Sequence, residues 1–419
     1  MKTPKFAVVI CNWNKKAFLS RCLESVFKST LIPDKVIVVD NASNDGSQEF
    51  LASYNDDRLH LINKLENTGG SGGFHTGVKC ALEFGYEFVH LLDNDAFVEP
   101  DCFANLLEHI QSDDKIGAVG AKILIDGQPI VQEIGAKVDW GCCSIIKNYS
   151  MCEDNSSLPE VISCDYLPAC SVMVRSLAIK KAGNIDESFF IYWDDIDWFW
   201  KIKSSGYKVL AISSAVANHT LGSRVKTSTF ATYYFTRNRI IFFLKNCDIQ
   251  SKSEVIDELL KVTFNTIFFS KFKEDNTTAL TAFNAMIDAL NLNLWKANEK
   301  YIRSREENPA LQKFLSKCSA VSLRYSGDPE VDTLITSFLD EHNISIGGGN
   351  TLSICNHISD IKEFEDGVIY IDRYLNLILS ENDFLNLNSY SDKLLQFKKK
   401  YTLRFEELFL SLRSDEHGE

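Results

Sequence analysis

The sequence lacks the long apolar segments that mark membrane-spanning or exported chains. No part of its 419 residues forms a run of roughly 20 uninterrupted apolar residues, the length of a transmembrane helix. The N-terminus, MKTPKFAVVICNWN, enters a strand-like run at once, without the apolar core of a signal peptide. We therefore expect a cytoplasmic protein.

Paired cysteine motifs are also missing. None of the 12 cysteines belongs to a C-x-x-C pair, so neither a zinc knuckle nor a redox dithiol is indicated. We interpret the cysteines as reduced, mostly buried small hydrophobic residues. A metal site among the five cysteines between Cys142 and Cys170 is the alternative, although no histidine stands at ligand spacing there.

Positive charge is scarce, because the formal net charge is −13. This balance argues against nonspecific nucleic-acid binding. The segment between Trp198 and Cys247 is different, since it contains no Asp or Glu and these basic residues: Lys201, Lys203, Lys208, Arg224, Lys226, Arg237, Arg239 and Lys245. An anionic partner for this surface is one interpretation, and a solvated face balanced by acids folded against it is the other.

The chain is long enough, and at 45% apolar residues hydrophobic enough, to form more than one structural unit. Its first 125 residues alternate strand-like and helical runs, which predicts an α/β layered, mainly parallel sheet with ligands at the carboxyl ends of the strands. From about residue 230 to 305 the apolar spacing is helical, and residues 306–419 are compatible with a small α/β appendage. We predict units at 1–229, 230–305 and 306–419, and interpret SIGGGNT (345–351) as a turn.

Polar residues follow the predicted strands. Asn14 follows the first strand and Asp40 the second, while Asp93 and Asp95 follow the fourth in LLDNDAFVEPD. Two carboxylates this close repel each other unless a divalent cation or several hydrogen bonds hold them. An acidic turn is the alternative for D-x-D taken alone.

The segment NTGGSGGFHTG (67–77) has five glycines just before a predicted helix. Glycine is costly in conformational entropy, so such density indicates a backbone that approaches something closely. The spacing is not G-x-G-x-x-G, and a flexible loop is the alternative.

A third group of polar residues lies in IDESFFIYWDDIDWFWKIK. Asp194, Asp195 and Asp197 stand among aromatic residues, which desolvate a carboxylate, raise its pKa and suit it to accept a proton. The alternative is an acidic helix N-terminus with core aromatics behind it. Downstream, His219 follows a strand and could complete a metal site built on Asp95, although a lone histidine is more often structural.

In their order, the motifs VVICNWN, VVDNASNDGS, NTGGSGGFHTGV, LLDNDAFVEPD, FFIYWDDIDW, NHTLGS and YYFTRNR make residues 5–245 resemble the inverting glycosyltransferases of the large family 2 type, which have a GT-A fold. The glycine-rich loop, the D-x-D followed by EPD, and the Trp-Asp-Asp motif are most similar to bacterial galactofuranosyltransferases. Two positions depart from the pattern: Asn94 stands where those enzymes commonly have Asp, and Lys201 where many relatives have Arg.

The resemblance implies roles for matching positions. Asp195, beside Asp194, would be the general base, and Asp95 with His219 would hold Mn²⁺ or Mg²⁺. The implied donor-binding residues are Asn14, Asp40, Asn67, Gly69, Gly70, Gly72, Gly73, Asp93, Asn94 and Arg224, with Asp40 at the uracil or ribose. The implied acceptor-binding residues are Trp193, Tyr192 and Arg237.

The implied function is metal-dependent, inverting transfer of a sugar, galactofuranose from UDP-galactofuranose in the first instance, to a hydroxyl of a surface glycan on a lipid carrier. That glycan would be an O-antigen, a capsule or a cell-wall polysaccharide. A rhamnosyl- or hexosaminyltransferase of the same fold, or a catalytically silent nucleotide-sugar or glycan-binding protein, is the alternative. Because Arg237, Arg239 and Lys245 stand beside aromatics, we also expect reversible contact with the inner face of an anionic membrane.

Overall fold

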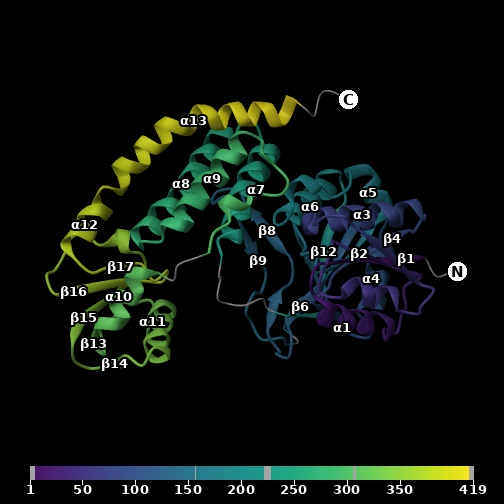
Figure 1. The fold of residues 1–419 in the computed structure, drawn as a ribbon, viewed down its shortest axis with the longest axis horizontal. Coiled ribbons are helices and arrows are strands. Elements are labelled where there is room, and N and C mark those ends of the chain that lie inside the picture. The colour runs from purple at the N-terminus through teal and green to yellow at the C-terminus, as the bar shows by residue number, and fades with distance from the viewer. Residues whose placement is uncertain (1–4, 156, 221–227, 305–307, 415–419) are drawn as a thin grey trace. The chain divides into compact units, whose positions relative to one another are not determined.

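The computed structural model describes residues 5–155, 157–220, 228–304 and 308–414 (Figure 1). The chain divides into two compact units. The first comprises Met1–Arg224 with Asn293–Lys296, and the second comprises Val225–Leu292 with Ala297–Glu419. The short segment Asn293–Lys296 belongs to the first unit, where the Trp295 N–H donates a hydrogen bond of 2.6 Å to the Ser188 carbonyl oxygen.

A ten-stranded sheet forms the centre of the first unit. Its parallel part consists of β1 (Phe6–Asn12), β2 (Lys35–Asp40), β3 (Leu59–Asn63) and β4 (Phe88–Asp93), in the order β3-β2-β1-β4. The other strands are β5 (Ala96–Val98), β6 (Ile116–Ile125), β7 (Val131–Glu133), β10 (Val161–Ser163), β11 (Ser171–Arg175) and β12 (Lys208–His219). Strand β11 runs antiparallel between β4 and β6, while β12 is parallel to β6, so the sheet is mixed beyond β4.

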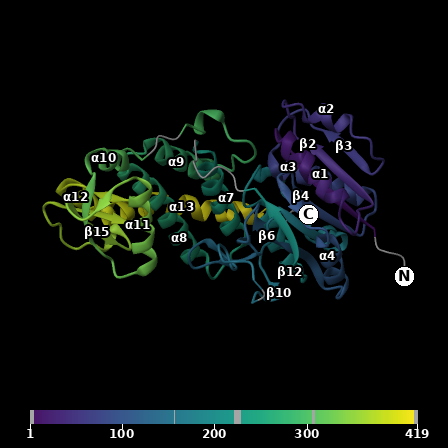
Figure 2. The same ribbon diagram turned by 90° about the horizontal axis from the view of Figure 1, so that it is seen from below.

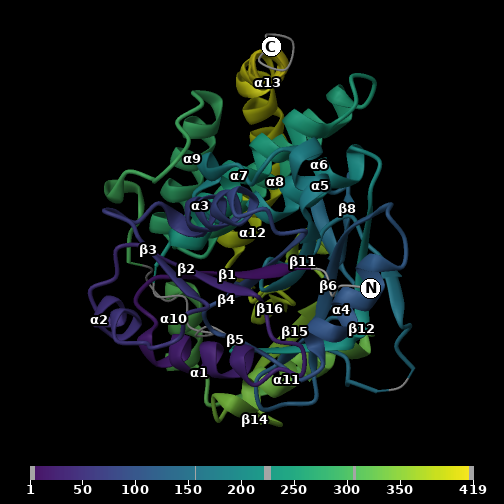
Figure 3. The same ribbon diagram turned by 90° about the vertical axis from the view of Figure 1, so that its right-hand side faces the viewer.

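Helices cover both faces of this sheet, as Figure 3 shows. One face carries α3 (Gly69–Glu83), α5 (Ser176–Ala182) and α6 (Asp194–Ser204), and the other carries α1 (Lys16–Phe27), α2 (Ser47–Ala52) and α4 (Cys102–Gln111). Alternate residues of β1, Phe6, Val8 and Ile10, belong to the core cluster that includes α1 and α4. Strand β1 is therefore apolar at nearly every position, because it is buried on both faces.

A two-stranded hairpin, β8 (Ala136–Asp139) and β9 (Ser144–Lys147), also belongs to the first unit.

The register of the parallel strands places their polar ends at one edge. Asn12 pairs with Asp40 between β1 and β2, and Cys11 pairs with Asp93 between β1 and β4. The ends of β1, β2 and β4 therefore lie side by side at the carboxyl edge of the sheet.

The second unit combines helices with a small sheet, which Figure 2 shows from below. Its long helices are α7 (Phe230–Asn246), α8 (Lys252–Phe272), α9 (Asn276–Leu290) and α13 (Tyr390–Ser414). Its sheet contains β13 (Ala320–Arg324), β14 (Ser345–Ile346), β15 (Asn350–Cys355), β16 (Val368–Asp372) and β17 (Leu377–Ile378), with α10 (Pro309–Lys317), α11 (Pro329–Glu341) and α12 (Glu381–Asn388). The sheet order is β14-β13-β15-β16-β17, and every pairing except β16 with β17 is parallel. The predicted helical region and α/β appendage are both present, whereas α13 was not predicted.

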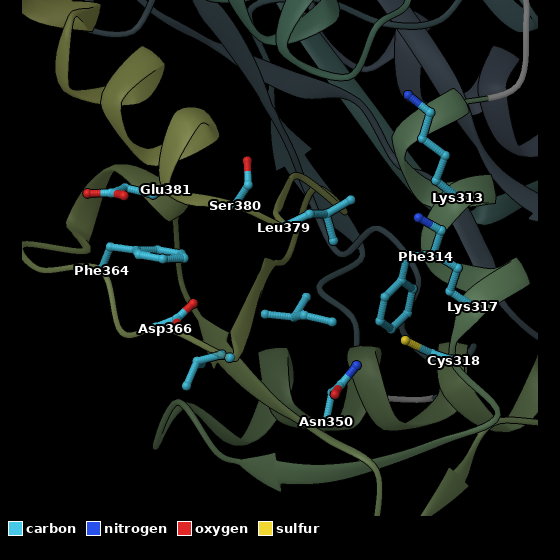
Figure 4. Close-up of a pocket in the computed structure, with 13 residues that line it drawn as sticks. Lys313, Phe314, Lys317, Cys318, Asn350, Phe364, Asp366, Leu379, Ser380 and Glu381 are labelled. Atoms are coloured by element: carbon cyan, nitrogen blue, oxygen red, sulfur yellow. The ribbon is translucent and has the colours of Figure 1, made fainter.

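Two smaller features complete the second unit. Gly347, Gly348 and Gly349 have positive φ between β14 and β15, so SIGGGNT is a turn, as predicted. A cavity of about 760 Å³ lies between α10, the start of β16 and the start of α12 (Figure 4). It contains none of the predicted site residues. Within the described residues, no helix is long and apolar enough to cross a membrane.

Candidate active site

A network of side-chain amides joins the ends of the central strands. Asn12, the last residue of β1, donates from Nδ2 to Asp40 Oδ2 at 2.9 Å, and its Oδ1 accepts a hydrogen bond of 2.8 Å from Asn94 Nδ2. Asp40 is fully buried, and its Oδ1 accepts from the Ser43 N–H at 2.9 Å and from Gln48 Nε2 at 2.8 Å. Both oxygens of Asp40 are thus used inside the protein. The carboxylate organises the strand ends, and its place at the uracil or ribose stays a prediction.

Asn14 ties the loops after β1 and β2 together. Its backbone N–H donates to Ser43 Oγ at 3.0 Å, and its Oδ1 accepts from the Asn44 N–H at 2.8 Å. The backbone φ of Asn14 is +50°, a conformation that asparagine tolerates better than most residues. Beside it, Trp13 is 51% exposed, so a large aromatic side chain is open to solvent at the edge where ligands are expected.

The glycine-rich segment is the start of α3 and not a loop that precedes a helix. Asn41 fixes its beginning, because Asn41 Nδ2 donates to the Gly69 carbonyl at 2.8 Å and to Asn67 Oδ1 at 3.1 Å. The backbone of Gly69 has φ +76°, and a Cβ there would lie 1.9 Å from the Phe190 carbonyl oxygen. Glycine is therefore required where the start of α3 meets the loop before α6.

Two further glycines of α3, Gly72 and Gly73, also leave no room for a side chain, whereas Gly70 does. An added Cβ would lie 2.5 Å from Thr68 Oγ1 at Gly72 and 2.1 Å from Cys11 Sγ at Gly73. At Gly70, no atom lies within 4 Å of an added Cβ. The predicted close approach is confirmed, but its partners are the protein's own Cys11 of β1, Thr68 directly before α3, and Phe190 of the loop before α6. The segment from Gly69 onward is helical and not a loop, while its place along the nucleotide stays a prediction.

Strand β5 brings Asp95 to His219. Ala96 pairs with His219 across β5 and β12, and the carbonyl of Asp95 accepts a hydrogen bond of 3.2 Å from the Thr220 N–H. As a result, His219 Nε2 lies 3.3 Å from Asp95 Oδ1. Lys15 approaches the other carboxylate oxygen, with Nζ 3.0 Å from Asp95 Oδ2. The predicted pairing of Asp95 with His219 is thus present in the structure.

The charged groups of this cluster shift one another's pKa values. Burial and then the charge of Asp95 raise the pKa of Asp93 to about 6. Burial acts to raise the pKa of Asp95, but the hydrogen bond and charge of His219, with Lys15, bring it below its usual value. Burial acts to lower the pKa of His219, whereas the hydrogen bond that it donates to Asp95 and the charges of Asp93 and Asp95 raise it. The carboxylates thus attract positive charge to this point.

Gln132, which the sequence did not indicate, orients His219. The Nδ1 atom of His219 lies 3.1 Å from Gln132 Oε1, an acceptor, so Nδ1 carries the proton. In a neutral imidazole Nε2 then has a lone pair, and it faces the Asp95 carboxylate at 3.3 Å. A proton or a metal cation must therefore lie between these two atoms. Gln132 stands 87 positions before its partner, and no local motif marks it.

The donor atoms fit a hard divalent cation. Carboxylate oxygens and imidazole nitrogen suit Mn²⁺ and Mg²⁺, and Asp93 and His219 also have ligand atoms within 4.8 Å of each other and of Cys170. Burial, with the charges of Asp93 and Asp95, raises the pKa of the Cys170 thiol well above its ordinary value. Sulfur is also a soft ligand, whereas Mn²⁺ and Mg²⁺ prefer oxygen, so Cys170 suits these cations less than the carboxylates do. The residues that fit the metal are Asp95 and His219, with Asp93 beside them.

A strained turn presents the second pair of carboxylates. Phe190, Tyr192 and Trp193 have φ of +68°, +63° and +68° immediately before α6, although bulky residues rarely adopt this conformation. Strain of this kind clusters at functional sites. The turn places Asp194 and Asp195 at the first two positions of α6, where Asp195 Oδ1 accepts a hydrogen bond of 2.8 Å from the Ile196 N–H.

Asp195 has the properties of a proton acceptor. Burial, followed by the charges of Asp194 and Glu133, raises its pKa well above the usual value for aspartate. Burial also raises the pKa of Asp194, whose side chain is almost fully enclosed, whereas Asp195 is half-buried. Asp195 is thus the more accessible of the two. Trp193 is buried and Tyr192 half-buried, so of the predicted acceptor residues on this turn Tyr192 is the one that reaches the surface.

Glu133 extends this acidic region, and sequence reasoning did not single it out. It is buried at the end of β7, where its Oε1 accepts a hydrogen bond of 2.6 Å from the Tyr166 hydroxyl. Lys147 donates to its Oε2, also at 2.6 Å. Strand β7 thus supplies a carboxylate, held by Tyr166 and Lys147, whose charge acts on Asp195.

Comparison with known proteins matches this region to one family. Residues 7–136 match the model of Glycosyl transferase family 2. They include β1 to β4, and the predicted GT-A type of fold is confirmed. The match supports the predicted enzyme class, glycosyltransferase.

Two curated proteins and one solved structure are similar to parts of this chain. An uncharacterized glycosyltransferase of Nostoc sp., alr2836, is 29% identical over 29% of this chain and 38% of its own length. The poly-beta-1,6-N-acetyl-D-glucosamine synthase of Staphylococcus aureus is 22% identical over 50% of this chain and 49% of the synthase. Among solved structures, that of GalNAc-T7 with UDP, GalNAc and Mn²⁺ matches 62% of this chain and 51% of its own, at 15% identity and a TM-score of 0.49. The chain spans less than half the length of these two curated relatives.

The acid-free segment is balanced by acids from elsewhere in the first unit. Lys201 Nζ lies 2.6 Å from the buried Asp197 carboxylate, Lys208 Nζ lies 2.7 Å from Asp113, and Lys203 pairs with Asp165. The balanced-face interpretation is correct for these three lysines. Arg224 and Lys226 lie outside the described residues.

Arg237 lies inside the second unit. It is fully buried in α7, with its guanidinium 5.0 Å from the Tyr234 ring centre and 5.4 Å from that of Tyr233, and its Nε donates to Asn238 Oδ1 at 2.8 Å. A buried guanidinium cannot meet an anionic headgroup. The prediction that Arg237 contacts an acceptor or a membrane is therefore wrong, because two tyrosines on its own helix cover it.

Proposed function

We propose that the chain is a metal-dependent, inverting glycosyltransferase that moves a sugar from a nucleoside diphosphate to a hydroxyl of a growing polysaccharide. The observation that carries the proposal is the presence of two distinct acidic sites in one unit. Asp95 with His219 suits a divalent cation, and Asp195 has a raised pKa suited to a base. The family match and the poly-N-acetylglucosamine synthase relative support both the reaction and a polysaccharide product.

At the donor end, Asp95 and His219 would hold Mn²⁺ or Mg²⁺, which neutralises the charge that develops on a departing diphosphate. Lys15 occupies one oxygen of Asp95 in the structure, and its exposed side chain is free to turn toward a phosphate instead. Asp93 lies next to this position and would face the ribose and sugar. The network of Asn12, Asp40 and Asn94 keeps the strand ends fixed beneath the nucleotide.

At the acceptor end, Asp195 would take the proton of the attacking hydroxyl. Inversion needs one base and no nucleophile on the opposite face of the sugar, and one accessible carboxylate meets that need. The charges of Asp194 and Glu133 raise the pKa of Asp195, so the carboxylate is a stronger base than an ordinary aspartate. Tyr192, at the surface of the strained turn, would contact the acceptor glycan.

The donor sugar is the finer part of the proposal. The motifs that resemble galactofuranosyltransferases favour UDP-galactofuranose. The synthase of an N-acetylglucosamine polymer, matched over half of this chain, favours a hexosaminyl donor as the second candidate. A rhamnosyl donor and a silent binding protein are the remaining alternatives, and only turnover separates them from these two.

The test is a donor panel with the purified protein, short glycan acceptors and Mn²⁺, read out as nucleotide release and glycan extension. We expect one UDP-sugar to turn over, chelation to stop the reaction and Mn²⁺ or Mg²⁺ to restore it. Asp195→Asn should lower turnover by about 10²-fold or more and leave donor binding nearly unchanged. Asp113→Asn, which removes a partly exposed carboxylate that pairs with Lys208 away from the site, is the matched control.

The results discriminate among the alternatives. If Asp195→Asn keeps full activity while Asp194→Asn is inactive, the base is Asp194 and the proposed assignment is wrong. Activity of both variants would refute the mechanism. Donor binding without any turnover in the wild-type protein would show a silent binding protein.

A further inference from the structure

A groove in the second unit has an aromatic floor and a basic rim. Its volume is about 490 Å³, within the range of small-molecule sites, and helices α8, α9 and α13 form it with one residue of α12. Figures 1 and 2 show α13 running along α8 within this unit. The groove is lined by Phe264, Ile267, Phe268, Lys271, Phe272, Phe283, Asn386, Lys393, Gln396, Phe397, Lys400 and Tyr401.

The floor is a set of packed rings contributed by different helices. The Phe397 ring of α13 lies 5.3 Å from that of Phe264 on α8 and 4.8 Å from that of Tyr401. Phe283 of α9 closes the set, 6.3 Å from Tyr401. Phe264 is nearly buried, whereas Phe283 and Phe397 are half-buried and form part of the groove surface. The floor thus offers an apolar surface that an extended hydrocarbon chain can cover.

The rim is cationic and lacks an acidic counterpart. Among the described residues that line the groove, three are exposed lysines and none is Asp or Glu. Lys393 Nζ donates to Asn386 Oδ1 at 2.8 Å and lies 5.6 Å from the Phe268 ring centre, while Lys400 Nζ lies 5.2 Å from that of Tyr401. In the part of the chain that the structure describes, Lys271, Lys393 and Lys400 have no carboxylate within 4.0 Å.

Neighbouring lysines on the same helices pair with acids, unlike the three lysines of the rim. On the same helix α13, Lys398 pairs with Asp257 of α8 at 2.6 Å. On α8, Lys261 pairs with Glu258 at 3.0 Å. In a chain of net charge −13, lysines beside acids are common, so three lysines without acids around one aromatic groove indicate an anionic ligand.

We propose that this groove binds an amphiphile with a phosphorylated end and an apolar chain, such as a prenyl or alkyl phosphate. The phosphate would lie at Lys271, Lys393 and Lys400, and the chain over Phe283 and Phe397. A bare phosphate would leave the aromatic floor unused, and an uncharged chain would leave the lysines unused. The proposal goes beyond the glycosyl transfer described above, since it needs no donor and none of the groove residues takes part in transfer.

The test is calorimetric titration of the full-length protein with monomeric farnesyl phosphate, in the absence of nucleotide sugar. We expect saturable binding, with farnesol and inorganic phosphate each binding at least about tenfold more weakly, the scale of one lost charge-assisted contact. Lys271→Glu with Lys400→Glu should weaken binding by about tenfold or more. Lys399→Glu, an exposed lysine next to Lys400 that does not line the groove, should have no effect.

The variant Phe283→Ala tests the apolar end of the groove. It should weaken the binding of farnesyl phosphate and leave the binding of inorganic phosphate unchanged. Absence of farnesyl phosphate binding overturns the proposal, and so does farnesol or inorganic phosphate binding as tightly. Equal effects of Lys399→Glu and Lys400→Glu also overturn it. Cosedimentation with phosphatidylglycerol vesicles separates the two sources of a lipid phosphate: vesicle binding without binding of the monomer would mean a membrane surface and not an enclosed site.

Discussion

Removal of the Lys201 ammonium should destabilise the first unit far more than removal of an equally short surface ion pair. Lys201 Nζ lies 2.6 Å from Asp197, whose side chain is 0% exposed, while the Lys201 side chain is 26% exposed. Breaking a buried pair from one side costs about 3–5 kcal/mol, because the buried charge loses its compensating cation. Since Lys201 itself is partly in water, we take the lower end, about 3 kcal/mol, for Lys201→Met.

The control is Lys208→Met. Its pair with Asp113 has nearly the same length, 2.7 Å, but the two side chains are 54% and 36% exposed. Pairs of this kind contribute about 0–1 kcal/mol. The two pairs have nearly equal lengths, and although Lys201–Asp197 is an i,i+4 pair within α6, such helix pairs contribute only about 0.3–0.5 kcal/mol when exposed. The burial of Asp197 therefore accounts for most of the predicted difference.

Urea unfolding followed by tryptophan fluorescence measures the effect, because all six tryptophans belong to the first unit. With an m-value of about 2 kcal/mol/M, the midpoint should fall by about 1.5 M for Lys201→Met and by less than about 0.5 M for Lys208→Met. The double variant Lys201→Met with Asp197→Asn should recover part of the loss, since no buried charge remains. Equal midpoints for the two single variants, or a double variant no more stable than Lys201→Met, would refute the reasoning.

The remaining predictions concern the site and its support. Gly73→Ala should lower the free energy of unfolding by about 1–3 kcal/mol, seen as a lower urea midpoint, because its Cβ would lie 2.1 Å from Cys11 Sγ. Turnover should rise as the pH rises through the raised pKa of Asp195, because the base acts in its deprotonated form. The apparent pKa of the acid limb of the kcat profile should therefore lie above the ordinary pKa of aspartate. Gln132→Leu should weaken Mn²⁺ binding about 10–100-fold, because His219 loses the acceptor that fixes its Nδ1 proton. The electron paramagnetic resonance of free Mn²⁺ measures this affinity, and an unchanged affinity would contradict the role of Gln132.

The parts of the fold that rest on periodicity could be predicted from the sequence. Strand β1 alternates Phe6, Val8 and Ile10 on one face with small or branched residues on the other, and such patterns depend only on near neighbours. The pairing of Asp95 with His219 was also accessible, because polar residues after strands collect at one edge. The existence of α13 was missed, since its apolar residues are interrupted by the charged run 398–400.

The errors have one physical cause: a sequence shows which residues are unusual but not what they meet. The density of glycine in α3 does mark close approach, yet the approaching atoms are Cys11 Sγ and the Phe190 carbonyl. Arg237 was counted as surface charge, whereas Tyr233 and Tyr234 cover it. Gln132 could not be found at all, because its role depends on a long-range strand pairing.

Because Asn293–Lys296 belongs to the first unit, that unit is completed only late in the synthesis of the chain. The hydrogen bond from the Trp295 N–H to the Ser188 carbonyl joins the segment to the loop that leads into the strained turn before α6. A ribosome must therefore make the whole of α7, α8 and α9 before the first unit can acquire its last contact. A chain cut after residue 229 would end with the loop at Ser188 uncovered, so a fragment chosen for biochemical work should extend at least to residue 296.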